Sequence, residues 1–258
     1  MQCDQQAAPM ILTDFAHTGF ALHLATDQPI TRYQVLGERS SGTNFAKRLL
    51  GRNTDLKPTE ALGWKHGFPH ALAIPPDLLV IGVVRSAKSW ALSMHAKPWH
   101  AGPDLQALPL SDFLRAPWDS YVDRPRYFDG AAAAGIVGQP LQYDRHPLTG
   151  ARFDNLFALR RAKLAGLLSY AERGCNFALL RMEDMTAQPE ATLDKLLSAL
   201  PNSKRAESFR PVIKRLGSKF KPAIPARPDT PKALSEDDLD FLRAETDKTQ
   251  EAILGYTY

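Results

Sequence analysis

The sequence predicts an α/β fold of three layers, in which helices cover both faces of a central, mainly parallel sheet. The strongest observation is the run Leu-Leu-Val-Ile-Gly-Val-Val at residues 78–84. Its almost continuous apolar character is typical of a parallel strand that is buried on both faces. Segments with strand character also alternate with segments of helical periodicity, the order that produces α/β folds. With 258 residues, a single domain over residues 1–258 is the expected organisation.

The N-terminal half alternates strands with helices. Short apolar segments predict strands at residues 20–25 and 33–36, followed by the central strand at 78–84. Helices are expected where helix-forming residues follow a polar turn, at residues 45–50 and 87–95. Each helix therefore comes directly after a strand, as in a βαβ unit.

The C-terminal half supplies one more strand and most of the helices. Residues 155–173 have helical periodicity with leucines on one face, and Gly174 is placed to end that helix. Residues 97–150 are irregular and contain several prolines, and they are predicted to form an insertion or lid near the site. The remaining elements are a strand at 176–181, a helix at 189–200, a basic helix at 203–216, a loop at 217–233 and a capped helix that begins at 234–238.

Composition and charge bound the function. The net charge of +4 is too small and too dispersed for a nucleic-acid-binding protein, but it suits a small polyanionic ligand. The two cysteines, Cys3 and Cys175, predict neither a disulfide framework nor a cysteine metal site. The sequence begins without the pattern of a signal peptide and contains no apolar run long enough to span a membrane, so a cytoplasmic location is expected.

A small, polar turn between the strand at 33–36 and the helix at 45–50 is the first candidate site. Its sequence, Gly37-Glu-Arg-Ser-Ser-Gly-Thr-Asn-Phe45, would place several amide groups at a helix N-terminus, where they can surround an anion. The spacing of Gly37 and Gly42 resembles a phosphate-binding P-loop, but Thr43 stands where that motif has its lysine. The turn is therefore expected to hold an anion other than the triphosphate of an ordinary NTPase.

A second candidate site begins where the central strand ends. Arg85 follows this strand, where a buried guanidinium without a partner is unfavourable and a bidentate anion would satisfy it. An ion pair with Asp or Glu is the structural alternative. Ser93 lies eight positions later on the expected helix, and Ser89 lies one turn before it on the same face.

Four segments, in order, resemble the sulfotransferases that use 3′-phosphoadenosine 5′-phosphosulfate (PAPS). Together they frame residues 33–256, although residues 97–150 match no known motif of the family. The resemblance implies a P-loop-like nucleotide-binding fold and in-line transfer of the sulfuryl group from PAPS to a hydroxyl or amine, without a metal. The segments are Arg39-Ser-Ser-Gly-Thr-Asn-Phe45, Val80-Ile-Gly-Val-Val-Arg85 with Ser93, Leu179-Leu-Arg-Met-Glu-Asp-Met185 with Pro189, and Leu234-Ser-Glu-Asp-Asp-Leu with Leu254-Gly-Tyr256.

The same resemblance implies roles for individual residues. His66 would be the catalytic base, with Glu38 and His95 as rivals, and Lys65 and Arg39 would stabilise charge on the transferring group. Lys47 is a further candidate for the missing cation. Residues 214–217 and Lys219 resemble a basic loop over the 3′-phosphate, although a solvated helix end is the favoured interpretation. The residues expected to bind PAPS are Ser40, Ser41, Gly42, Thr43, Asn44, Phe45, Arg85 and Ser93.

Two other functions stay open at this point. A P-loop kinase or NTPase would need a lysine in the loop and an acidic Mg²⁺ ligand at a strand end, where this sequence has Arg85. A non-catalytic relative would bind nucleotide without turnover. The sequence leaves the acceptor, whether a small molecule or a glycan, and the oligomeric state undecided.

Overall fold

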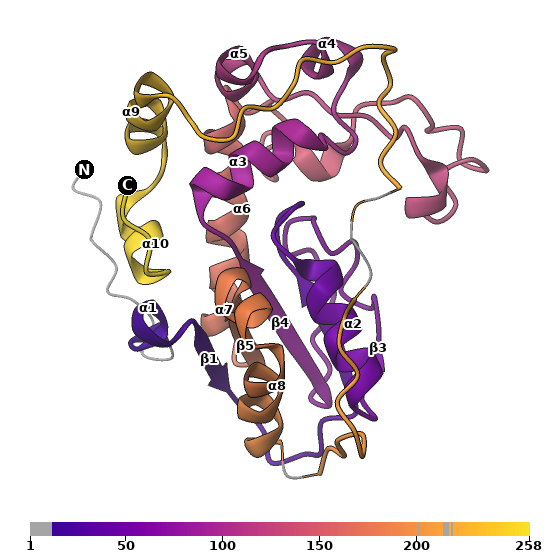
Figure 1. Ribbon diagram of the computed structural model, residues 1–258. Coiled ribbons are helices and arrows are strands. Elements are labelled where there is room, and N and C mark those ends of the chain that lie inside the picture. Colours follow the sequence, from indigo (N-terminus) through magenta and orange to yellow (C-terminus); the bar gives the residue numbers. More distant parts are fainter. Residues whose placement is uncertain (1–11, 201, 214–216, 218) are drawn as a thin grey trace.

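The structure, a computed structural model, describes residues 12–200, 202–213, 217 and 219–258. Its centre is a five-stranded sheet with the strand order β1-β5-β4-β2-β3, in which β1 alone is antiparallel to its neighbour. The predicted α/β class with a mainly parallel sheet is therefore confirmed (Figure 1). The strands are β1 (Phe20–His23), β2 (Arg32–Leu36), β3 (Lys57–Pro58), β4 (Leu78–Val84) and β5 (Phe177–Arg181).

Helices cover both faces of the sheet, because the side chains of β4 alternate between two cores. One set, with Leu79 and Ile81, packs beneath α2, α7 and α8, and the other, with Leu78 and Val80, packs against α6, α1 and α10. All of β4 is buried, as its apolar sequence predicted. The helices of these two layers are α1 (Phe15–Thr18), α2 (Thr43–Asn53), α6 (Leu156–Leu168), α7 (Met182–Ala187), α8 (Pro189–Ser198) and α10 (Lys248–Ile253).

A third hydrophobic cluster lies at the carboxyl end of the parallel strands. It joins α6 to α3 (Ala87–Ala96), α4 (Pro103–Gln106), α5 (Leu110–Arg115) and α9 (Glu236–Glu245). Trp90, Phe113 and Trp118 are at its centre and are almost completely buried. The first part of the predicted insertion, residues 97–118, is therefore part of the core.

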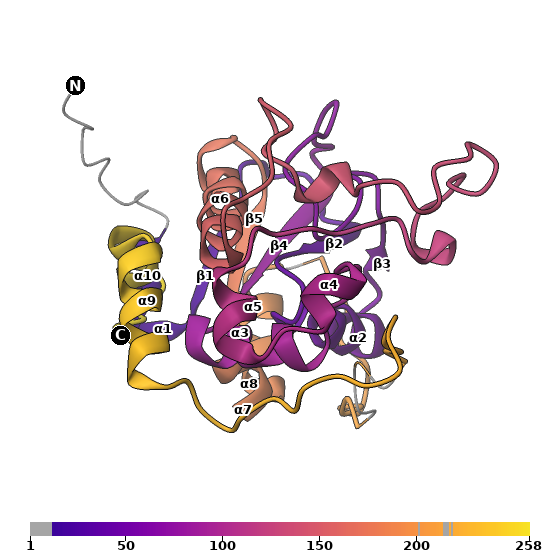
Figure 2. The same ribbon diagram turned by 90° about the horizontal axis from the view of Figure 1, so that it is seen from above.

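The rest of the predicted insertion has its own small cluster. Val122, Ala131 and Leu141 pack together there, with Trp64 and Phe128 at the edge. Only short helical turns, Pro125–Tyr127 and Gln142–Asp144, interrupt the loop. Part of this region extends away from the sheet in both views (Figures 1 and 2).

The predicted basic helix at 203–216 is wrong for the residues that the structure describes. Residues 202–213 contain no helix. Instead, the buried side chain of Asn53, at the end of α2, donates to the Arg210 carbonyl at 3.1 Å and accepts from its amide at 2.7 Å. The Asn53 carbonyl also accepts from the Ala206 amide at 2.9 Å. These long-range hydrogen bonds fix the segment in an extended path along α2, against its local helical pattern.

The other predicted elements are present with shifted ends. The predicted helix at 155–173 divides into α6 and a 3₁₀ turn (Ser169–Glu172), and Gly174 follows with φ 59°. The side chain of Ser235 caps α9, as predicted. Among the described residues, no helix is both long and apolar enough to cross a membrane.

Candidate anion-binding and catalytic site

The turn after β2 is tight because Gly37 passes close to the neighbouring strand. Its φ is 155°, and a Cβ atom here would lie 2.5 Å from the Val83 carbonyl oxygen of β4. The amide and the hydroxyl of Ser41 both donate to the Glu38 carbonyl, at 3.2 and 2.7 Å, and close the turn. Ser41 is fully buried, so its hydroxyl supports the turn and is not free for the anion contact that the sequence suggested.

The amide groups at the start of α2 have no acceptor within the part of the chain that the structure describes. The N–H groups of Gly42, Thr43 and Asn44 donate to no described residue, and no side chain caps the helix. Free amides at the positive end of a helix dipole attract an anion. Lys65 lies beside them, with its Nζ 2.6 Å from Asn44 Oδ1. A cation from a different segment, between β3 and β4, therefore lies beside the amides of a loop that has no lysine of its own.

Burial changes the protonation of this lysine. The ammonium of Lys65 is half-buried, and desolvation lowers its pKa to about 8, with a further contribution from Lys47. An anion at the α2 N-terminus would stabilise the charged form. Lys47 itself forms an exposed ion pair with Glu60 at 2.9 Å.

Arg85 forms the second arm of the site. Its Nη1 donates to the Ser40 carbonyl at 2.9 Å and its Nε to the Ser89 hydroxyl at 2.9 Å. Burial lowers the pKa of this guanidinium, and the charge of Glu183 opposes the effect. No carboxylate among the described residues forms an ion pair with it, so the structural alternative is not observed. A half-buried guanidinium with spare donors is a natural partner for an anion.

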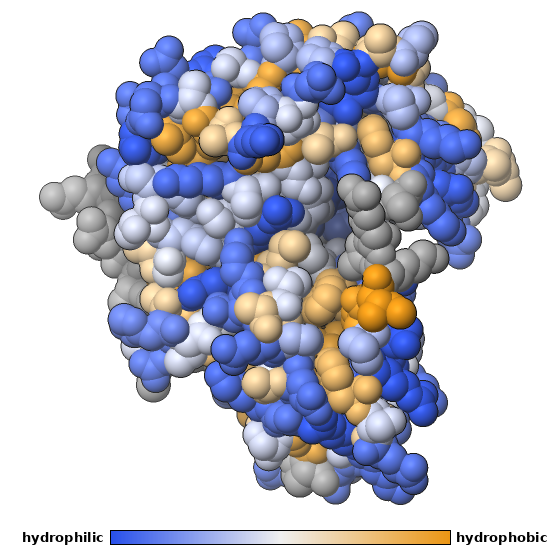
Figure 3. Space-filling view, viewed as in Figure 1, coloured by the Kyte–Doolittle hydropathy of each residue, from blue (hydrophilic) through white to orange (hydrophobic). Residues whose placement is uncertain are grey.

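The hydrogen-bond donors near the start of α3 determine which groups could bind an anion beside Arg85. Ser93 is half-buried on the same face as Ser89, and its hydroxyl bonds to no residue in the described ranges. The amide of Ser86, by contrast, already donates to Glu183 at 3.0 Å. An anion beside Arg85 would therefore use side-chain donors more than the amides of α3. The face that carries α2 and α3 is hollowed between them, with residues of mixed hydropathy around the hollow (Figure 3).

His66 lies against the turn in a single tautomer. Its Nδ1 is 2.6 Å from the Gly37 carbonyl oxygen, and because a carbonyl only accepts, Nδ1 carries the proton and Nε2 keeps its lone pair. Desolvation, followed by the charge of Lys65, holds the pKa of this imidazole well below its usual range. The edge of the ring meets Trp64, with centroids 5.1 Å apart. His66 is thus neutral at physiological pH, with an unprotonated Nε2, and the same burial makes it a weaker base than an ordinary histidine.

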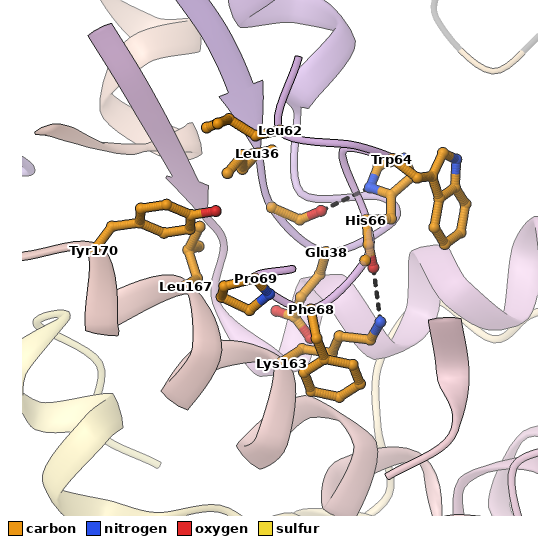
Figure 4. A pocket seen from close by; sticks show the side chains of 12 residues that line it. Leu36, Glu38, Leu62, Trp64, His66, Phe68, Pro69, Lys163, Leu167 and Tyr170 are labelled. Atoms are coloured by element: carbon orange, nitrogen blue, oxygen red, sulfur yellow. Dashed lines mark hydrogen bonds between the residues drawn. The ribbon is translucent and has the colours of Figure 1, made fainter. Parts of the chain in front are cut away.

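A small cavity joins His66 to the rival base, Glu38 (Figure 4). The carboxyl of Glu38 is buried, and its Oε1 has no hydrogen-bond partner among the described residues. Burial raises the pKa of this carboxyl to about 7, even though Arg160 opposes the effect. Tyr170 and Lys163 line the same cavity. Glu38 therefore stays a candidate proton acceptor on geometric grounds.

Two predicted site residues have other roles. Arg39 forms a buried ion pair with Asp144 at 2.6 Å, so its charge is already neutralised and it is not a free cation for the transferring group. His95 uses both ring nitrogens, with Nδ1 2.7 Å from the Thr230 hydroxyl and Nε2 3.0 Å from the Leu108 carbonyl. It connects α3 to neighbouring segments and has no nitrogen left for catalysis.

Three further predictions concern cofactor contacts. Phe45 is half-buried and packs against the core beneath α2, which leaves an edge for a ligand. Gly217 lies beside Lys97 at the end of α3, where an added Cβ would be 3.1 Å from Nζ. Lys219 is exposed. Residues 214–216, the rest of the predicted basic loop, lie outside the described residues.

The buried charges that support the site were not predicted from the sequence. Lys163 of α6 donates to the His66 carbonyl at 2.7 Å and lies 3.4 Å from Asp144. Arg160, also of α6, is completely buried and bonds to Glu38 at 2.6 Å. Both residues fall on the leucine stripe of their helix, and a charge at such a position is the feature that could have identified them.

The site has no counterpart that comparison identifies. The chain matches no family model, no curated protein and no solved structure. Within the described ranges, no group of three or more His, Cys, Asp or Glu residues is arranged to hold a metal.

Proposed function

We propose that the protein is a PAPS-dependent sulfotransferase. The observation that carries this proposal is a pair of incomplete anion pockets at the ends of the adjacent parallel strands β2 and β4. One consists of the free amides of residues 42–44 beside Lys65, and the other of Arg85 with Ser93. PAPS carries two anionic groups separated by a nucleoside, and ligands of open α/β sheets bind at this edge.

The residues of the two pockets divide the binding of PAPS between them. The amides of residues 42–44 and the ammonium of Lys65 would hold the 5′-phosphosulfate, and Arg85 and Ser93 the 3′-phosphate. The half-buried ring of Phe45 would stack on the adenine of PAPS. Preorganised donors of this kind stabilise developing charge without reorganisation during the reaction.

Catalysis would combine positioning with proton transfer. PAPS supplies the sulfuryl group, which passes in line to the acceptor oxygen or nitrogen as the bond to the 5′-phosphate breaks and adenosine 3′,5′-bisphosphate leaves. Nε2 of His66 takes the acceptor's proton, and its Nδ1–H bond to Gly37 fixes the tautomer and the ring orientation. Lys65 offsets charge that accumulates on the leaving phosphate.

Calorimetry with adenosine 3′,5′-bisphosphate tests the binding claim. Arg85→Ala should weaken its binding at least tenfold, because it removes a charge-assisted contact worth about 1.5–3 kcal/mol. ATP with Mg²⁺ is the comparison ligand, and binding of ATP without binding of the bisphosphate would overturn the proposal.

The pH dependence of turnover separates the two candidate bases. With His66 as base, kcat should stay constant down to well below pH 6.5, because burial keeps this imidazole neutral. A fall in kcat centred near pH 7 would instead assign Glu38, whose pKa is about 7. His66→Gln should abolish turnover of an accepted substrate while binding of the bisphosphate remains.

A further inference from the structure

A buried network of hydrogen bonds connects the two anion-binding arms through α6. Arg160 is at its centre, with no solvent exposure. One side of its guanidinium donates to Glu38 Oε2 at 2.6 Å, in the turn after β2. The same group donates to the Arg85 carbonyl at 2.8 Å, at the end of β4. The guanidinium of Arg160 therefore bonds to a side chain of the first arm, Glu38, and to the backbone of the second arm, at Arg85.

The network continues to the segment that follows α10. Glu251 accepts two hydrogen bonds from Arg160, at 2.7 and 3.1 Å. The hydroxyl of Tyr258 donates to Glu251 at 2.9 Å and accepts from the Ala87 amide at 2.8 Å. Because Ala87 is the first residue of α3, the hydroxyl joins the start of that helix to the guanidinium.

The geometry points to Arg160 and Tyr258 as positioning residues that set the spacing between the two anion-binding arms. This inference rests on the proposed function for its ligand. Arg160 is suited to the role because its fork makes several bonds in fixed directions, which an ammonium group cannot do. The Trp90 ring packs against the guanidinium, with its centroid 5.1 Å from Arg160 Cζ, and restricts the orientation of that group. Neither positioning residue is needed to touch the ligand.

Tyr258→Phe is the most specific test, because it removes one hydroxyl and keeps the ring. We expect the Kd for adenosine 3′,5′-bisphosphate to rise roughly threefold to tenfold, because the hydroxyl loses both its bond to Glu251 and its bond from the Ala87 amide. The matched control is Thr246→Val, which removes a buried hydroxyl that bonds to the Leu242 carbonyl at 2.8 Å, away from Arg160. The control should lower the melting temperature and leave the Kd unchanged.

Hydrogen exchange provides a readout that does not depend on the ligand. In Tyr258→Phe, amides should exchange faster both at residues 86–89 and in the turn at residues 38–42. Faster exchange at residues 86–89 alone, or an unchanged Kd, would overturn the inference. If the wild-type protein fails to bind the bisphosphate, the proposed function is wrong, and the exchange data still decide whether the arms are coupled.

Arg160→Lys supplies a second variant. Because it acts through the same network, its effect on the Kd should be less than additive with that of Tyr258→Phe. Full additivity would show that the two residues act independently and would contradict the inference. If Arg160→Lys does not fold, the test rests on Tyr258→Phe and its control.

Discussion

The affinity of the protein for the proposed anionic ligand should fall as the pH rises through 8. Lys65 is the reason, because burial lowers its pKa to about 8 and only its protonated form attracts the anion. About 90% of this lysine is protonated at pH 7 and about 10% at pH 9, so the Kd should rise roughly tenfold between these values. Binding of the anion is therefore coupled to uptake of a proton by Lys65 at high pH, and to little proton uptake at pH 7.

Lys65→Arg is the decisive variant for this prediction. A guanidinium stays charged beyond pH 9, so the Kd for adenosine 3′,5′-bisphosphate should become almost independent of pH between 7 and 9. Lys65→Met should weaken binding at pH 7 by about 2 kcal/mol, or roughly 30-fold. Calorimetry at several pH values measures both effects. The same tenfold slope in wild-type and Lys65→Arg proteins would refute the reasoning and direct attention to Lys163, whose pKa is also about 8.

Three predictions concern stability and are measured by urea unfolding. Burial raises the pKa of Glu38 from 4.5 to about 7, so the folded state binds this proton more tightly than the unfolded state. The free energy of unfolding should therefore fall as the pH rises through this range, by up to about 3 kcal/mol. Glu38→Gln should remove that dependence, and an unchanged pH profile would show that other groups cause it. Arg39→Met should cost about 3 kcal/mol, because Asp144 would keep a buried charge without its main partner; a loss below 1 kcal/mol would argue against the buried pair. Gly37→Ala should lower the free energy of unfolding by about 1–3 kcal/mol, since the new methyl group would meet the Val83 carbonyl. Wild-type stability in this variant would contradict the contact.

The fold was largely predictable because its central strand is so apolar. Residues 78–84 have no polar side chain, and such a run is stable only when it is covered on both faces. The wrong prediction at residues 203–213 has a long-range cause. Their helical pattern is overridden by Asn53, a residue about 150 positions earlier, and no sequence window contains both partners.

The turn and the strand end that form the candidate site were predictable from the sequence, but the pairing of its charged side chains was less so. Glycine spacing identified the turn at Gly37, and the end of a buried strand identified Arg85. The pairing of Arg39 with Asp144 joins residues 105 positions apart, and nothing in either local sequence indicates it. Lys65, in contrast, was among the named candidates, and the structure places it at the amides of α2.

Lys65 and His66 are consecutive residues, so one loop places both of the groups that the proposed function uses. Their side chains diverge, one toward Asn44 and the other toward the Gly37 carbonyl, but they share one backbone. A backbone shift in this loop would therefore move the ammonium and the imidazole together. Under the proposed function, a substitution that displaces the loop should weaken donor binding and proton transfer at the same time, whereas a change to one of the two side chains should affect only one of them.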